Sequence, residues 1–166
     1  MDVKRKVVES QKKIIGALAQ CETRIGSLYE KYASCFPAMK TMWLSLAAAE
    51  KTHADMLRTM NRILDKGNIF YNLGKFSDEA IQPIVTLVDD ALKKTGHSGL
   101  TFSEAISTAL RIETSIVDSH FYDVVASDAP EFRIIAERLS ADTKTHVDTI
   151  RNHFQKDVQN QTQGSL

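Results

Sequence analysis

The chain has 166 residues, with 21 basic and 21 acidic side chains, so its formal net charge is zero. This balance lacks the basic surface of a dedicated nucleic-acid-binding protein, and the length favours one domain with a sizeable core. Seven glycines and three prolines are too few for the many tight turns of an all-β fold. No stretch has the apolar length of a signal peptide or a transmembrane helix, so a cytoplasmic protein without a membrane partner is predicted.

The first predicted helix covers residues 3–34 and ends at the second cysteine. Cys21 and Cys35 lie 14 residues apart in the sequence, which on one helix is roughly 20 Å and beyond disulfide distance. Reduced cysteines agree with the predicted cytoplasmic location. The second helix is predicted to begin at Pro37, since proline is tolerated in a first turn, and to end before Gly67, a C-terminal cap.

A crossover segment follows the second helix. It is predicted to contain a shorter helix at 77–95, after the capping pattern Ser-Asp-Glu. About 35 residues separate the second long helix from the third, which is enough chain to cross the length of a helical bundle. The third long helix is predicted to open at Thr101 or Ser103 and to end near Ser127.

The fourth long helix is predicted to follow the break at Pro130 and to continue to about residue 159. In all four long helices apolar residues recur at three- and four-residue steps, which is typical of helices packed around one core. The predicted fold is therefore all-α, a four-helix bundle with one long crossover between helices two and three, as in ferritin-like folds. Residues 1–158 are predicted to form this single domain, and residues 159–166 a polar tail.

Ionisable residues interrupt the apolar stripes near the middle of every long helix. They are Glu22, Glu50, His53, Glu113 and His146. Burying a charge costs several kcal/mol unless it is paired or bound to a metal, and no lysine or arginine occupies these stripes. A bound cation is the simplest compensation.

The spacing of these residues is repeated along the chain. Glu50 and His53 form Glu-x-x-His, whose members share one helix face and can reach one ion. The segment 46–58 (LAAAEKTHADMLR) aligns without gaps to 139–151 (LSADTKTHVDTIR), with the same residue at seven of thirteen positions. A weaker match joins the segments around Glu22 and Glu113. The pattern indicates a duplicated helix pair.

This pattern resembles that of the ferritin-like di-iron proteins, most closely the rubrerythrin branch, without its Cys-rich rubredoxin-type domain. The resemblance covers about residues 10–156. The family has a Glu and then Glu-x-x-His on its first helix pair, and the same set on the second pair. The residues that match this ligand set are Glu22, Glu50, His53, Glu113 and His146.

One position departs from the family pattern. The fourth helix has Thr143 where the family has a glutamate that usually bridges the metals. Asp142 is the alternative fourth carboxylate, although its stem is shorter and it points about 100° around the helix from position 143. The further helix-three carboxylate that is common in this branch is replaced by Ile116.

Other polar residues near the stripes are interpreted as structural. His120 lies two turns after Glu113 and is predicted to be a core or supporting histidine rather than a ligand. Tyr29 and Tyr32 are predicted to pack in the core, the alternative being hydrogen bonds to the site carboxylates. His97 and His153 lie outside the pattern.

The resemblance implies a di-iron oxidoreductase of peroxidase or ferroxidase type that acts on hydrogen peroxide or dioxygen. His53 and His146 would each bind one iron, with Glu50 bridging and with Glu22 and Glu113 as terminal carboxylates. The resemblance also implies a separate electron-donor protein and a homodimer. The alternative is a non-redox or metal-depleted bundle that holds one zinc or iron, or none, and acts as a metal-binding or structural module through a partner.

Overall fold

The computed structural model describes residues 2–66, 81–97, 99–119, 121–122 and 129–163. All regular structure in these ranges is helical, which confirms the predicted all-α class. The elements are α1 (Asp2–Cys35), the 3₁₀ helix η1 (Pro37–Met39), α2 (Lys40–Asp65), α3 (Gln82–Thr95), α4 (Phe102–Asp118) and α5 (Pro130–Gln163). Within these ranges no helix combines the length and apolar character needed to traverse a membrane.

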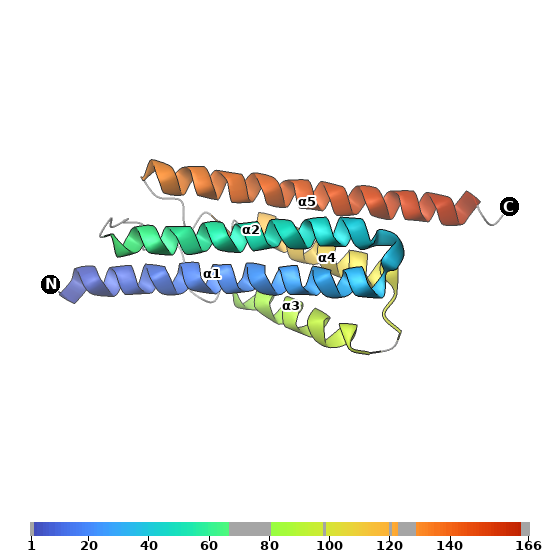
Figure 1. Ribbon diagram of the computed structural model, residues 1–166, viewed down its shortest axis with the longest axis horizontal. Helices are drawn as coiled ribbons and strands as arrows, with labels where there is room; N and C mark the ends of the chain where they lie inside the picture. Colours follow the sequence, from blue (N-terminus) through green and yellow to red (C-terminus); the bar gives the residue numbers. More distant parts are fainter. Residues whose placement is uncertain (1, 67–80, 98, 120, 123–128, 164–166) are drawn as a thin grey trace.

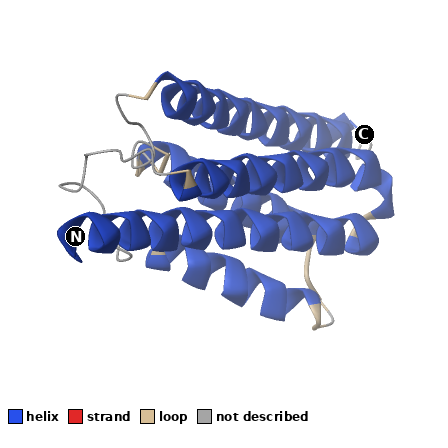
Figure 2. Cartoon of the chain, turned by 60° about the vertical axis from the view of Figure 1, so that its left-hand side comes forward, coloured by secondary structure: helices blue, strands red, loops and turns tan. Residues whose placement is uncertain are grey.

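The helices are arranged lengthwise in two antiparallel pairs, α1 with α2 and α4 with α5 (Figure 1). Figure 2 shows α3 against the outside of this group, where it packs on α1 and α4. Helix α3 carries the chain back along the molecule, so α4 begins beside the turn between α1 and α2. The rings of Phe36 and Phe102 mark this proximity, with centroids 5.6 Å apart.

Local sequence explains where the helices begin. Phe36 precedes a proline, which disfavours helical backbone, and its φ and ψ of −127° and 75° separate α1 from η1. Helix α4 begins with a capping box: Thr101 Oγ1 accepts from the Glu104 backbone N–H at 3.2 Å, and the Thr101 N–H donates to Glu104 Oε2 at 2.8 Å. Of the two predicted starts, Thr101 is therefore the N-cap.

Two helix ends differ from the predicted ones. Helix α4 ends at Asp118, well before the predicted residue 127, and the Phe121 N–H donates to the Ile116 carbonyl at 3.2 Å. This five-residue step widens the last turn and stops the regular ladder. Helix α5 continues to Gln163, so residues 159–163 of the predicted polar tail are helical. The predicted start of the crossover helix, at residue 77, lies outside the described residues.

The apolar stripes of the helices pack into one core. Leu18 and Ile25 of α1, Leu57 of α2, Ala109 of α4 and Leu139 of α5 are all fully buried. The polar interruptions lie between these residues and are buried with them, which brings them together inside the helix bundle.

Candidate metal centre

Five ionisable side chains meet in the middle of the molecule. They come from α1 (Glu22), α2 (Glu50 and His53), α4 (Glu113) and α5 (His146), and their exposed fractions lie between 0 and 6%. All five belong to the set predicted from the sequence. The helical stripes therefore place each of them on the face that the structure buries.

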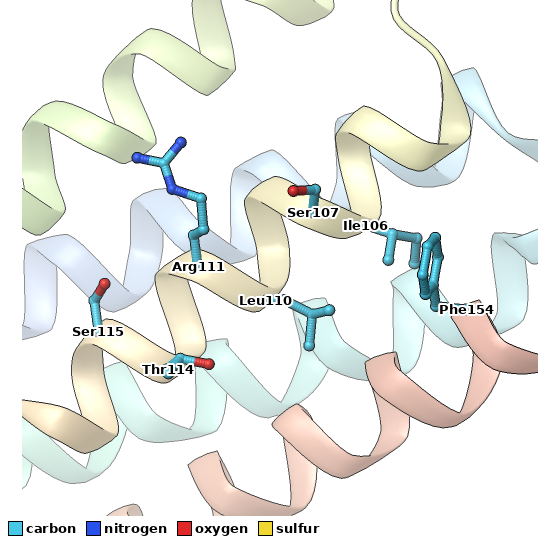
Figure 3. A pocket seen from close by; sticks show the side chains of 7 residues that line it. All are labelled: Ile106, Ser107, Leu110, Arg111, Thr114, Ser115 and Phe154. Atoms are coloured by element: carbon cyan, nitrogen blue, oxygen red, sulfur yellow. The ribbon is translucent and has the colours of Figure 1, made fainter.

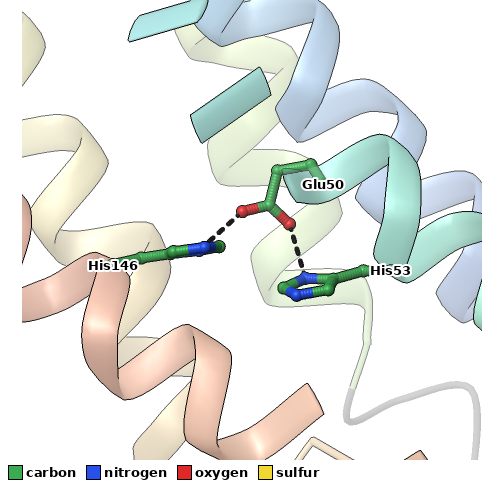
Figure 4. A group of neighbouring side chains, drawn as sticks. All are labelled: Glu50, His53 and His146. Atoms are coloured by element: carbon green, nitrogen blue, oxygen red, sulfur yellow. Dashed lines mark hydrogen bonds and ion pairs between the residues drawn. The ribbon is translucent and has the colours of Figure 1, made fainter. Parts of the chain in front are cut away.

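Glu50 lies at the centre of this group. Its Oε2 is 3.1 Å from Nδ1 of His53, and its Oε1 is 2.8 Å from Nδ1 of His146 (Figure 4). The two imidazole rings are stacked with centroids 5.3 Å apart. One ligand atom from each of these three residues lies within 4.8 Å of the others, a spacing that one metal ion can span.

Each imidazole also faces a second carboxylate. Nδ1 of His53 is 3.9 Å from Oε2 of Glu22, and Nδ1 of His146 is 3.6 Å from Oε2 of Glu113. The first pair joins α1 to α2 and the second joins α4 to α5. Each half of the internal repeat therefore supplies one histidine that faces one glutamate, and Glu50 faces both histidines.

Two buried tyrosines hold the outer carboxylates. Tyr29 of α1 donates its hydroxyl to Oε1 of Glu113 at 2.5 Å, and Tyr122 donates to Oε1 of Glu22 at 2.6 Å. Each tyrosine thus comes from the opposite half of the chain to the carboxylate that it holds. In both glutamates Oε1 accepts the hydrogen bond from a tyrosine, and Oε2 faces a histidine.

Tyr122 was not predicted as part of the site. It follows Glu113 by nine residues, which on a continuous helix is about 900°, or half a turn away from the site face. The end of α4 at Asp118 removes that constraint and lets the Tyr122 hydroxyl reach Glu22. Tyr29 is hydrogen-bonded to a site carboxylate, which is the alternative to simple core packing that the sequence left open. His120 lies outside the described residues.

Thr143 occupies the position of the expected fourth glutamate. It is buried, and its hydroxyl donates to the Leu139 carbonyl at 2.9 Å in the preceding turn. The same oxygen is 3.5 Å from the Tyr122 hydroxyl. The position therefore brings a neutral hydroxyl to the site and no charge.

Asp142 approaches the site from another side. Its Oδ2 is 3.5 Å from Nε2 of His53, the ring nitrogen opposite the one that faces Glu50. It also lies 3.6 Å from Nε of Arg138, and its side chain is 41% exposed. A carboxylate on the far nitrogen of a metal-binding imidazole fixes the orientation of the ring. The geometry suits Asp142 to this orienting contact better than to direct ligation.

We expect Asp142→Asn to weaken metal binding by about 10- to 100-fold, because the imidazole of His53 loses its charged orienting partner. Asp148→Asn is the matched control, since Asp148 is an exposed carboxylate on the same helix that pairs with Arg151 at 3.5 Å. Titration of both variants with Co²⁺, followed by its visible absorption, measures the effect. Equal affinities in the two variants would contradict the orienting role.

Burial and mutual repulsion set the charges of the metal-free site. Burial, reinforced by the charge of Glu50, raises the pKa values of Glu22 and Glu113 above the ordinary carboxyl value. Burial also acts on Glu50, but its contacts with His146 and His53 prevail and lower its pKa. For His146 burial opposes the charged form, yet Glu113 and Glu50 raise its pKa to about 10. The favoured metal-free state is an ionised Glu50 beside a protonated His146.

The donor set fits a divalent metal. Within the described part of the chain, the ion pairs of Glu22, Glu50 and Glu113 are all with the two histidines, and none is with a lysine or arginine. Glu50 Oε1 and His146 Nδ1 are 2.8 Å apart, but neither has a partner at hydrogen-bonding angles. Glu22 Oε2 is unpartnered in the same sense, whereas His53 Nε2, which also lacks a hydrogen bond, faces Asp142. Buried oxygen and imidazole donors left in this way suit iron or zinc.

The remaining described histidines lie apart from the centre, as predicted. Nδ1 of His97 contacts the Lys93 carbonyl at 2.8 Å, and Nδ1 of His153 contacts the Thr149 carbonyl at 2.9 Å. Both are local contacts to the preceding helical turn. They make these residues suitable controls for the site histidines.

Comparison of the chain with protein-family models found no match, and searches of curated proteins and of solved structures each found no significant match. The function is therefore argued from the residues of the centre and from the arrangement of the helices around it.

Proposed function

We propose that the protein is a ferritin-like, rubrerythrin-type oxidoreductase whose buried centre holds two irons and acts on hydrogen peroxide or dioxygen. Two antiparallel helix pairs with a helix in the connection between them support the ferritin-like assignment. The internal repeat supports it as well, since both halves contribute a glutamate and a histidine. A separate electron-donor protein and a homodimer belong to the same proposal.

The residues of the centre have distinct roles in this proposal. His53 with Glu22 would hold one ion, and His146 with Glu113 would hold the other. Glu50 would be shared, because its two oxygens face the two histidines. The chemistry that iron would supply in this centre is reduction of the oxidant by electrons from its ferrous state.

The protein contributes a buried set of ligands that are held in place. The five site residues are buried, so competing water is kept from them. Tyr29 and Tyr122 hold one oxygen of Glu113 and of Glu22, which fixes the carboxylates before an ion binds. Burial raises the pKa values of both phenols well above the ordinary value, so both hydroxyls keep their protons at neutral pH.

A second candidate function is a non-redox centre with a single ion, such as zinc. Thr143 favours it, because three carboxylates and two imidazoles match one ion better than two. The close group of Glu50, His53 and His146 also fits a single ion. In this case the protein would act as a metal-binding or structural module.

The observation that carries the proposal is the buried set of three glutamates, whose ion-pair partners among the described residues are histidines alone. Metal content per chain tests it directly. Protein grown with added iron is expected to hold about two irons, and His53→Ala with His146→Ala is expected to remove them. The matched control is His97→Ala with His153→Ala, which changes two histidines outside the centre and is expected to leave the metal in place.

Three results would change the assignment. One iron per chain, or one zinc, would favour the single-ion candidate. Absence of metal from the unaltered protein would overturn both functions. Equal loss of metal in the site and control variants would show that the metal is bound elsewhere. Circular dichroism of every variant verifies that the helices are retained.

A further inference from the structure

A cavity of about 630 Å³ lies between the end of α4 and the N-terminal half of α5. Ile116, Val117 and Phe121 form its wall on the α4 side, and Ala136 lies on the α5 side. Cavities of this size and apolar character bind small organic molecules in proteins. The early end of α4 creates the space, because a helix continued past Asp118 would run along this part of α5.

The floor of the cavity belongs to the metal centre. Tyr122 and Thr143 line the cavity with buried side chains, and Tyr122 donates directly to Glu22. A molecule in the cavity would thus be separated from a site carboxylate by one tyrosine hydroxyl. A glutamate at position 143 would place a longer, charged side chain between the cavity and the centre. The threonine side chain is shorter and neutral.

Charged residues lie along the α5 side of the cavity. Arg133 and Lys144 are exposed, face the cavity, and have no ion-pair partner in the described part of the chain. Glu137 is the one carboxylate among the described residues of the lining, so these residues together carry a net positive charge. Arg133 and Lys144 are separated by roughly 16 Å along the helix axis, which gives the cavity an elongated form.

We propose that this cavity binds a small organic carboxylate with an extended apolar body. The apolar part would pack on Phe121 and Ala136, and the positive charges of Arg133 and Lys144, near the two ends of the cavity, would attract the carboxylate.

A second hollow of about 400 Å³ provides a contrast. It is formed on α4 by Ile106, Leu110 and neighbouring residues, and is bordered at one side by Phe154 of α5 (Figure 3). Arg111 is its charged residue, and none of its lining side chains belongs to the centre. It serves as the competing location in the test.

The test is calorimetric titration of the metal-free, full-length protein with 4-phenylbutyrate, with 4-phenyl-1-butanol as the uncharged analogue. We expect saturable binding of the acid to one site and weaker binding of the alcohol. Ala141→Trp places an indole in the cavity from an exposed position and is expected to lower affinity at least about tenfold. Arg133→Gln with Lys144→Gln is expected to weaken binding of the acid but not of the alcohol.

The internal repeat supplies a matched control. Ala48 is the exposed alanine of α2 that aligns with Ala141, and it does not line the cavity. Ala48→Trp is therefore expected to leave binding unchanged. Absence of saturable binding, equal loss in both tryptophan variants, or loss in Leu110→Trp instead of Ala141→Trp would overturn the proposal. Because metal is removed first, failure of the proposed function would not alter this result.

Discussion

The metal-free protein is expected to lose stability steeply as the pH rises from 6.5 to about 10. His146 has its pKa raised from 6.5 to about 10, so the folded state binds this proton more tightly than the unfolded chain does. Its stabilising contribution is complete below pH 6.5 and is lost as the pH approaches 10. At about 1.4 kcal/mol per pKa unit, the loss is on the order of 3–5 kcal/mol.

The outer carboxylates change stability in the same direction. The pKa values of Glu22 and Glu113 are raised on folding, so their contribution is present at low pH and falls as the pH rises above the ordinary carboxyl value. Glu50 acts oppositely, because its lowered pKa gives a contribution that is present above the ordinary value and is lost in acid. The metal-free protein should therefore be most stable in mildly acidic solution.

Metal reverses this trend. An ion that binds Glu22, Glu113 and His146 displaces their protons, so its affinity and its stabilising effect rise with pH. At a free concentration about 1,000 times the Kd, bound metal adds about 4 kcal/mol. Thermal unfolding at several pH values, with EDTA and separately with Fe²⁺ under nitrogen, measures how the stability of the metal-free and of the metal-bound protein changes with pH.

Histidine variants test whether His146 causes the pH dependence of the metal-free stability. His146→Gln removes one titrating group and is expected to make the fall in metal-free stability above pH 6.5 shallower, whereas His153→Gln should leave the fall unchanged. A metal-free stability that is constant or rising between pH 6.5 and 9 would contradict the charge states derived for the centre.

Periodicity was sufficient to predict the helical class and the burial of the residues proposed as the site. Glu22, Glu50 and Glu113 were identified because each interrupts an apolar stripe, and a helix must bury the whole of such a stripe. His53 and His146 interrupt the stripes in the same way, and the repeated spacing related the two histidines to each other. Their burial and mutual contacts agree with that reasoning, while their role as metal ligands remains a prediction.

Features that depend on departures from regular helix were not predicted. Tyr122 reaches Glu22 because α4 ends at Asp118, and no strong breaker marks that point before the Asp-Ala-Pro segment ending at Pro130. The contact of Asp142 with His53 was missed for another reason. Sequence spacing gives the direction of a side chain around its own helix, but not the rotation and offset of the helix packed against it.

Thr143→Glu is expected to have opposite effects with and without metal. In the metal-free protein it adds a fourth buried carboxylate within reach of Tyr122 and close to Glu22, while the protonated His146 is already paired with Glu50 and Glu113. We expect a loss on the order of 3 kcal/mol, or about 6–12 °C in Tm for a chain of this size. With iron the same residue supplies the missing negative charge, so the more weakly bound ion should bind more tightly.

Two control variants separate the effect of charge at position 143 from the effects of side-chain size and of added charge elsewhere on α5. Thr143→Gln has the shape of glutamate without its charge, so it should show a smaller loss and no gain in iron. Thr145→Glu adds the charge at an exposed position on the same helix and should change neither stability nor metal content appreciably. If Thr143→Glu raised neither the iron content nor the affinity of the second ion, position 143 would not be the missing bridging ligand. The three-carboxylate centre would then be complete with a single ion, because nothing else in the described part of α5 brings a buried carboxylate to it.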